Sequence, residues 1–164
     1  MRSGLISTPA LAPAPVVALC FAALPAWGGG LTCPAGWGSD ARACHVPECV
    51  APMGGGLIRV DRYASLDGMS FPQAFDSIQK AVGADGTPLH DLLSEEAVEV
   101  AGLPGLRRDY IGSARGMDLH IALVLVRHAG DDILLRAVWT LDHDALFALL
   151  VAPSIESWDP RVRD

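Results

Sequence analysis

Three cysteines stand close together in a segment rich in glycine and proline, and they are the residues of this chain best suited to chemistry. These are Cys33, Cys44 and Cys49. In an oxidising compartment, cysteines of a small domain form disulfides by default. Three cysteines allow three pairings, and each pairing leaves one thiol over. We therefore expect one disulfide, with its pairing left open, and the remaining thiol would allow a disulfide-linked dimer.

A zinc site is the alternative use of the same segment. His45 directly follows Cys44, so that four ligands of the right kind lie between Cys33 and Cys49. None of the spacings matches a CxxC pair, and the adjacent Cys44 and His45 would strain to reach one tetrahedral ion. The disulfide is therefore favoured over the metal, and no metal site is assigned.

The N-terminal stretch indicates the compartment. Residues 3–39 carry no charged side chain, and Val16–Leu24 is an apolar run of the length found in signal-peptide cores. We expect residues 1–28 to be a signal peptide cleaved before Gly29, which would place the protein in the periplasm or outside the cell. An uncleaved membrane anchor is the alternative, because Leu5–Leu31 is long enough to span a bilayer despite its prolines.

The charge of the chain limits its partners. The formal net charge is −7, and Lys80 is the only lysine. Nucleic-acid binding needs clustered Lys and Arg against the phosphates, and Arg107–Arg108 is the only basic doublet. The sequence has no phosphate-binding loop and no dinucleotide fingerprint, so it implies no cofactor. The expected partner is an unknown protein, with a membrane only if the N-terminal segment is retained.

Several histidines and acidic residues could bind a metal, but simpler roles explain them. His120 and His128 share a strand face about 26 Å apart at ~3.3 Å per residue, too far for one ion, and are expected to be polar strand-end residues. Asp142–Asp144 is expected to cap a helix, where the helix dipole favours negative charge. Asp131–Asp132 is expected to form a turn.

The remaining polar groups do not make a catalytic pattern. Glu95, Glu96 and Glu99 are expected to be solvated strand flanks rather than a carboxylate pair. Ser113 lies in a G-S-x-x-G sequence, which is not the nucleophile elbow G-x-S-x-G. No catalytic residue is assigned, and the sequence predicts no enzymatic activity.

The first patterned elements are a strand and a helix. Leu57–Ala64 alternates and is expected to be an edge strand, after a glycine-rich linker at Met53–Gly56. Ser70 and Gln73 form a capping box at the start of a helix that Gly83 ends. The apolar stripe of this helix is Phe71, Ala74, Phe75, Ile78, Ala81 and Val82.

The middle of the chain predicts a short helical turn and then strands. The turn is expected at Thr87–Leu93, followed by a strand at Glu95–Ala101, a turn at Gly102–Gly105 and a strand at Leu106–Ala114.

Leu119–Val126 and Ile133–Trp139 form the strongest β signal, a hairpin with a type II′ turn at Gly130–Asp131. Its register would place Ala122, Val124 and Val126 on one face with Ile133, Leu135, Ala137 and Trp139. The other face would hold Ile121, Leu123, Leu125, Leu134, Arg136 and Val138. Both faces are apolar apart from Arg136, so these are expected to be central strands covered on both sides.

A final helix is expected at Asp142–Ala152, ended by Pro153, with Leu146, Leu149 and Leu150 buried and Phe147 at the edge. Ser154–Trp158 is expected to return along the sheet, and residues 159–164 to form a polar tail. The elements predict an α+β domain at 57–158, an antiparallel sheet with helices packed on both faces. It follows a cysteine-containing segment and linker at 29–56.

The stretch Ser70–Trp158 resembles the PsbP-like fold of small exported bacterial proteins. The matching features are the early helix, Gly102–Arg107 ahead of a strand that contains Tyr110, the long hairpin with its Gly-Asp turn, and the C-terminal helix. The cysteine-containing segment departs from that pattern. The resemblance implies a binding or assembly module without enzymatic chemistry.

Two functions follow from the sequence. The first is an exported, non-enzymatic interaction or structural module with an unknown partner. The second is an exported small-ligand or metal-binding protein that uses the cysteine-containing segment and one edge of the sheet.

Overall fold

The computed structural model describes residues 30–39, 48–65, 68–83 and 89–161. Its strands are β1 (Gly38–Ser39), β2 (Glu48–Val50), β3 (Gly56–Ala64), β4 (Leu89–Val100), β5 (Leu103–Ala114), β6 (Met117–His128) and β7 (Asp131–Thr140). The helices are α1 (Phe71–Gly83) and α2 (Asp144–Ser157), with 3-10 turns η1 (Pro52–Gly54) and η2 (Leu141–His143). The expected signal peptide and Cys44 lie outside the described residues.

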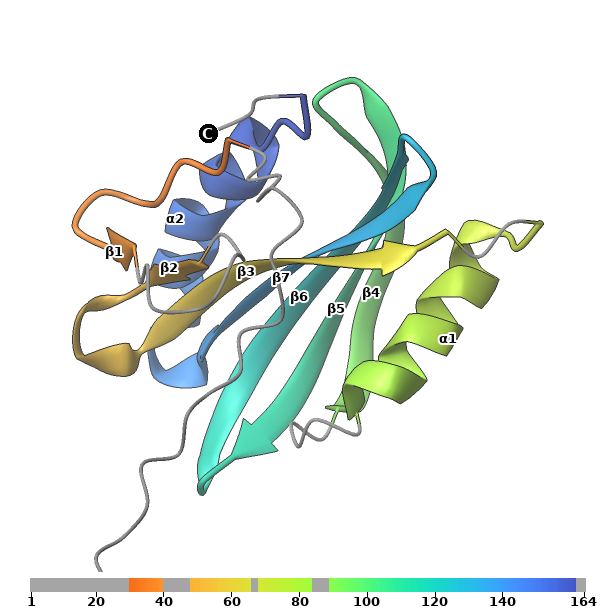
Figure 1. Cartoon of the computed structure of the whole chain (residues 1–164). Helices are drawn as coiled ribbons and strands as arrows, with labels where there is room; N and C mark the ends of the chain where they lie inside the picture. The colour runs from red at the N-terminus through yellow and green to blue at the C-terminus, as the bar shows by residue number, and fades with distance from the viewer. Residues whose placement is uncertain (1–29, 40–47, 66–67, 84–88, 162–164) are drawn as a thin grey trace, which may run out of the picture.

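The described strands form one antiparallel sheet in the order β1-β2-β3-β7-β6-β5-β4 (Figure 1). The expected α+β class, with an antiparallel sheet and two helices, is confirmed. The prediction of β3 as an edge strand is wrong, because β2 pairs with one side of β3 and β7 with the other. No helix in the described part of the chain has the length and apolar character needed to cross a bilayer.

Three tight turns of one kind join β4 to β5, β5 to β6 and β6 to β7. They are Ala101–Gly102, Arg115–Gly116 and Ala129–Gly130, and both residues of each have a positive φ. That combination is the mark of a type I′ turn, whose twist suits a hairpin. The expected II′ turn at Gly130–Asp131 is therefore wrong, as is the turn at Gly102–Gly105, most of which belongs to β5.

The hairpin of β6 and β7 nevertheless has the predicted faces. His128 pairs with Asp131, which shifts the register by two positions from the one predicted. Side chains alternate along a strand with a period of two, so that a shift of two leaves every residue on its predicted face. The position of β6 and β7 inside the sheet is confirmed as well.

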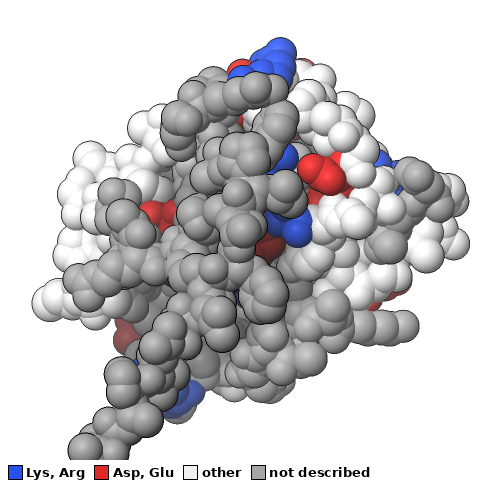
Figure 2. Space-filling model, viewed as in Figure 1, with Lys and Arg blue, Asp and Glu red and all other residues white. Residues whose placement is uncertain are grey.

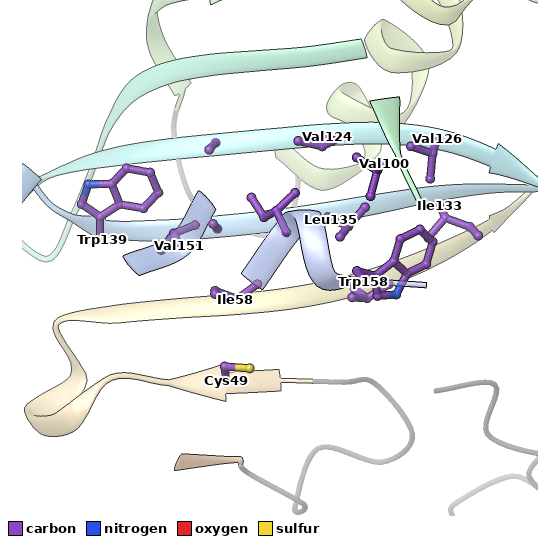
Figure 3. Packing of buried hydrophobic residues seen from close by; sticks show 14 residues of the cluster. Cys49, Ile58, Val100, Val124, Val126, Ile133, Leu135, Trp139, Val151 and Trp158 are labelled. Atoms are coloured by element: carbon purple, nitrogen blue, oxygen red, sulfur yellow. The ribbon is translucent and has the colours of Figure 1, made fainter. Parts of the chain in front are cut away.

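Two separate core clusters use alternate residues of these strands. One contains the even-numbered β6 residues from Ala122 to Val126 with Leu135 and Trp139, and α2 adds Val151 and Ile155 to it (Figure 3). The other contains Ile121, Leu123, Leu125 and Leu134, and α1 adds Ala74, Phe75 and Ile78. Each helix therefore packs in a cluster of its own.

Helix α1 follows the sequence prediction. The backbone N–H of Ser70 donates to Oε1 of Gln73 at 3.0 Å, and the backbone N–H of Gln73 donates to Oγ of Ser70 at 3.4 Å, so the capping box is confirmed. Ala74, Phe75 and Ile78 of the expected stripe are buried. The side chains of Ala81 and Val82 lie outside the description.

Helix α2 departs from the prediction at both ends. Asp142 lies in η2, no side chain caps the start of the helix at Asp144, and Pro153 lies inside it. A proline there costs one backbone hydrogen bond, and the helix continues to Ser157, so the expected return of Ser154–Trp158 along the sheet is wrong.

The buried face of α2 was also wrongly predicted. Leu146 and Leu149 are 58% and 75% exposed, whereas Val151, Ser154 and Ile155 are buried. The fully buried Trp158, just after the helix, packs in the same cluster. The inward face is therefore set by residues near the C-terminal end of the helix and not by its leucines.

Strand β4 replaces the helical turn expected at Thr87–Leu93. Residues 84–88 lie outside the description, but Leu89–Leu93 belongs to the strand and pairs with β5. The register is interrupted at two points, between Leu89 and Asp91 and between Leu92 and Ser94. Pairing with β5 therefore prevails over the local helical signal.

Candidate binding site

A disulfide joins Cys33 to Cys49, with the two Cα atoms 5.5 Å apart. It is one of the three pairings that the sequence left open, and it uses two of the ligands that a zinc site would need. Cys49 is fully buried in β2, which pairs with β3, so the disulfide ties Cys33 to the sheet. A structural disulfide favours an oxidising compartment outside the cytoplasm.

A cavity of about 440 Å³ opens on the sheet. Its apolar lining includes Val50, Leu57, Leu119, Ile121, Leu123 and Val138. Three of these, Leu119, Ile121 and Leu123, also belong to the cluster that packs with α1, while α1 itself contributes none of the described lining residues. Its volume and apolar character are typical of small-molecule sites.

Strand register explains how residues distant in the sequence line this cavity. Val50 pairs with Leu57, Leu57 with Val138, and Val138 with Ile121, so one row of apolar side chains crosses β2, β3, β7 and β6. The backbone of Gly54–Gly56, in the turn between β2 and β3, forms part of the wall. The cysteine-containing segment thus supplies one side of the cavity.

The next row across the same strands is polar. Glu48 pairs with Arg59, Arg59 with Arg136, and Arg136 with Leu123. Of these, Glu48, Arg136 and Leu123 line the cavity and Arg59 does not. The cavity therefore has an apolar floor with a charged border on one side.

Arg136 is held in place by a buried carboxylate. Its Nη2 donates to Oδ2 of Asp61 at 3.0 Å, and Nε of Arg59 approaches Oδ1 of the same aspartate at 2.6 Å. The Nε atom of Arg136 is buried and has no hydrogen-bond partner among the described residues. Burial raises the pKa of Tyr63, and the hydrogen bond to Arg136 opposes that rise.

Another charged group stands apart from this row. Arg115 lines the cavity from the turn between β5 and β6 and is exposed. The guanidinium groups of Arg59, Arg136 and Arg115 thus outnumber the carboxylates of Asp61 and Glu48 by one. Among the described residues around the cavity, positive charge therefore exceeds negative charge, in a chain whose net charge is −7.

A second polar cluster surrounds His120. Nδ1 of its ring is 2.7 Å from Oδ1 of Asp144, and Nε2 is 3.0 Å from Oδ1 of Asp109. The ring stacks on Trp139, with centroids 4.3 Å apart, and the indole N–H of Trp139 donates to Asp144 at 2.7 Å. Arg107 adds two hydrogen bonds to Asp109, at 2.7 and 2.8 Å.

This cluster favours the protonated histidine. A neutral imidazole has one N–H and can donate to one carboxylate, whereas the imidazolium donates to both. Burial alone would lower the pKa of His120, but the hydrogen bonds to Asp109 and Asp144 outweigh it and raise the pKa. For Asp109, burial is opposed by His120 and Arg107, which hold the pKa of the carboxyl well below its usual range.

The other polar residues singled out by the sequence lie apart from the cavity. Glu95 pairs with Arg108 at 2.6 Å, and Glu96 lies 3.9 Å from Arg107. Asp131 and Asp132 begin β7 and do not form the expected turn, and Asp132 accepts a hydrogen bond from Arg127. Among the described residues, no group of three or more His, Cys, Asp and Glu side chains is arranged to hold a metal ion.

Ser113 and His128 lie on strands β5 and β6. His120 was expected to be a simple strand-end residue, and its contacts with Asp109 and Asp144 were missed. The sequence gives little sign of these contacts, because Asp109, His120 and Asp144 belong to β5, β6 and α2 and meet only in the folded protein. For Arg136 the sequence does hold a signal, because it is the one charged residue on an otherwise apolar strand face.

No protein-family model matches the chain, and no curated protein does. Solved structures do match its fold. PA94, a protein of unknown function from Pseudomonas aeruginosa, shares 16% identity and a TM-score of 0.53 over 65% of this chain and 74% of its own. Cyanobacterial PsbP (CyanoP) from Synechocystis shares 17% identity and a TM-score of 0.52 over 74% of this chain and 81% of its own. The chain thus resembles PsbP-like proteins in its fold, as the sequence indicated.

Proposed function

We propose that this protein is a non-enzymatic binding module of the periplasm or the extracellular space, and that its binding site is the apolar cavity on the sheet. The observation that carries the proposal is the cavity itself, about 440 Å³ of space beside the row Val50, Leu57, Val138 and Ile121. Open apolar space of this size on a sheet has a cost in lost packing, which a bound apolar group would offset.

We infer that α1 and α2 cover opposite faces of the sheet, because their clusters take alternate residues of β6. On this arrangement α2 shields one face and α1 part of the other. The cavity then occupies the part of the second face that α1 leaves open. The proposal unites the two functions that the sequence suggested, since a module of this kind binds a small apolar ligand or an apolar group of a larger partner.

Export is supported by the disulfide between Cys33 and Cys49 and by the apolar N-terminal stretch. Binding without catalysis is supported by the site itself. Its lining is mostly apolar and suits shape-dependent binding, and Arg136 is hydrogen-bonded to Asp61. On the face seen in Figure 2, blue and red side chains of the described residues are interspersed. The net charge of −7 supports a partner other than nucleic acid, which would need clustered Lys and Arg.

The test uses N-phenylnaphthylamine, a neutral probe that fluoresces in apolar surroundings. The wild-type chain should bind it with saturable fluorescence. Val138→Trp should abolish the signal, because Val138 lies in the apolar row of the cavity and a larger side chain would fill the space. Val98→Trp is the matched control, since Val98 is a half-buried valine outside the lining. Equal binding by both variants, or none by the wild type, would refute the proposal.

A further inference from the structure

The cavity combines an apolar row with an adjacent row of charge, and this pairing restricts what it can hold. Leu57, Val138 and Ile121 form the floor, and Arg136 stands one row away on the same strand as Val138. A ligand that lies along the floor would bring one end to the guanidinium. We propose that the cavity binds a single-chain amphiphile with an anionic head, and this inference rests on the proposed function. The head group would lie on Arg136 and the chain along the floor.

The charges favour an anion over a neutral or cationic head. Arg59 and Arg136 oppose each other across β3 and β7 and share one carboxylate, that of Asp61. One carboxylate neutralises one of the two guanidinium groups. Glu48, at the cavity wall, is the cross-strand partner of Arg59 and lies on the far side of Arg59 from Arg136. An added negative charge is therefore most stabilised when it lies next to Arg136.

Arg136 also has unused hydrogen-bonding capacity. A guanidinium carries five N–H groups in a planar fork suited to a carboxylate or phosphate. The guanidinium is hydrogen-bonded to Asp61 through Nη2 and also to Tyr63, while Nε is buried and has no partner among the described residues. A buried donor without an acceptor is costly, so a shift of the Arg136 side chain that brought Nε to an anionic head group would be favoured.

Arg115 is the rival position for the head. It lines the cavity as well, but it is exposed, and it belongs to a turn in which its φ is positive. An exposed guanidinium is well solvated and gains little from an added anion. Arg136 retains only 16% of its side-chain exposure, so its interaction with an anion is less screened.

The experiment measures displacement of N-phenylnaphthylamine by decanoate and by decanol, which share the same chain and differ in the charge of the head. Decanoate should displace the probe from the wild type at a concentration at least roughly tenfold lower than decanol, the usual gain from a hydrogen bond to a charged group. Arg136→Met should remove that preference. Arg62→Met removes one positive charge from β3 outside the lining, at a residue that pairs with Asp131, and should retain the preference.

The outcomes separate the head group from the cavity. Equal displacement by decanol and decanoate in the wild type would overturn the anionic head and leave the proposed function standing. Failure of both compounds, with no binding of the probe itself, would overturn the proposed function. Loss of the preference in Arg115→Met and not in Arg136→Met would overturn the position of the head. The wild-type comparison of decanoate with decanol needs no variant. It therefore still tests whether the cavity prefers an anionic head if Arg136→Met does not fold.

Discussion

Arg59 and Arg136 face each other as cross-strand partners on β3 and β7, and both bind the carboxylate of Asp61. Two like charges directly opposite on neighbouring strands are destabilising unless a counter-charge lies between them. Asp61 supplies it from a buried position, 7% exposed. The polar border of the cavity is therefore held together by one carboxylate.

Asp61→Asn should lower the free energy of unfolding and tighten the binding of decanoate. Removal of the shared carboxylate leaves two guanidinium groups opposed, at a cost of about 2–3 kcal/mol given that Arg59 is half exposed. The same change releases Arg136 for an anionic ligand. Denaturant unfolding and probe displacement measure the two effects.

Asp131→Asn is the matched control, because Asp131 pairs with Arg62 at 3.5 Å and its side chain is 42% exposed. It should change the free energy of unfolding by no more than about 0.5 kcal/mol. An Asp61→Asn variant as stable as this control would show that the two arginines do not depend on Asp61.

The His120 cluster should make stability depend on pH. The folded-state pKa of His120 is raised above its ordinary value near 6.5, so its stabilising contribution is complete below about pH 6.5 and is lost as the pH rises through the raised value. His120→Gln should therefore cost most at about pH 6, about 1–3 kcal/mol, and less at alkaline pH. Urea unfolding across this range measures the difference.

Asp144→Asn provides the check on that account. It removes one of the two carboxylates that face the ring of His120, so the dependence on pH should become flatter. A cost of His120→Gln that grows with rising pH would contradict the assignment of the protonated ring.

Gly105 should tolerate no side chain. A Cβ atom at this position would lie 2.6 Å from the backbone oxygen of Leu125 and 2.8 Å from Cγ1 of Val126. Gly105→Ala should therefore cost about 1–3 kcal/mol through overpacking between β5 and β6. Gly38→Ala, where nothing lies within 4 Å of the added atom, should stay within about 0.5 kcal/mol. Thermal unfolding of the two variants makes the comparison, and equal melting temperatures would refute it.

The free energy of unfolding should fall when the side chain of Ile155 in α2 is replaced by alanine, and should hardly change when that of Leu149 is replaced. Ile155 is 5% exposed and packs in the core with Trp158, whereas Leu149 is 75% exposed. Ile155→Ala should cost about 2–5 kcal/mol, and Leu149→Ala no more than about 0.5 kcal/mol. The reverse order in denaturant unfolding would restore the buried face that the sequence suggested.

The sequence predicted what depends on local patterns. The capping box of Ser70 and Gln73 and the alternating faces of β6 and β7 need only neighbouring residues, and both are found in the structure. The faces were right even though the turn was misplaced, because the register error was an even number of residues.

What the sequence missed depends on contacts between distant residues. Pro153 predicts the end of a helix, but α2 continues to Ser157. The residues beyond the proline, Ile155 and Trp158, pack in the core and stabilise this longer helix. The cavity needs Val50, Leu57, Ile121 and Val138 to meet in one row, and the strand order that brings them together cannot be read from any one segment. Arg136 gave the one local hint, as a charge on an otherwise apolar face.

The most direct test of the binding site is a map of the amide chemical shifts of the protein titrated with decanoate. We expect the largest shifts at Leu57, Ile121, Arg136 and Val138, with residues 94–100 of β4 and the outward face of α2 unchanged. Shifts centred on residues 94–100 of β4 or on Leu146 and Leu149, or no saturable shifts at all, would contradict the assignment of the cavity as the site where this protein binds its ligand.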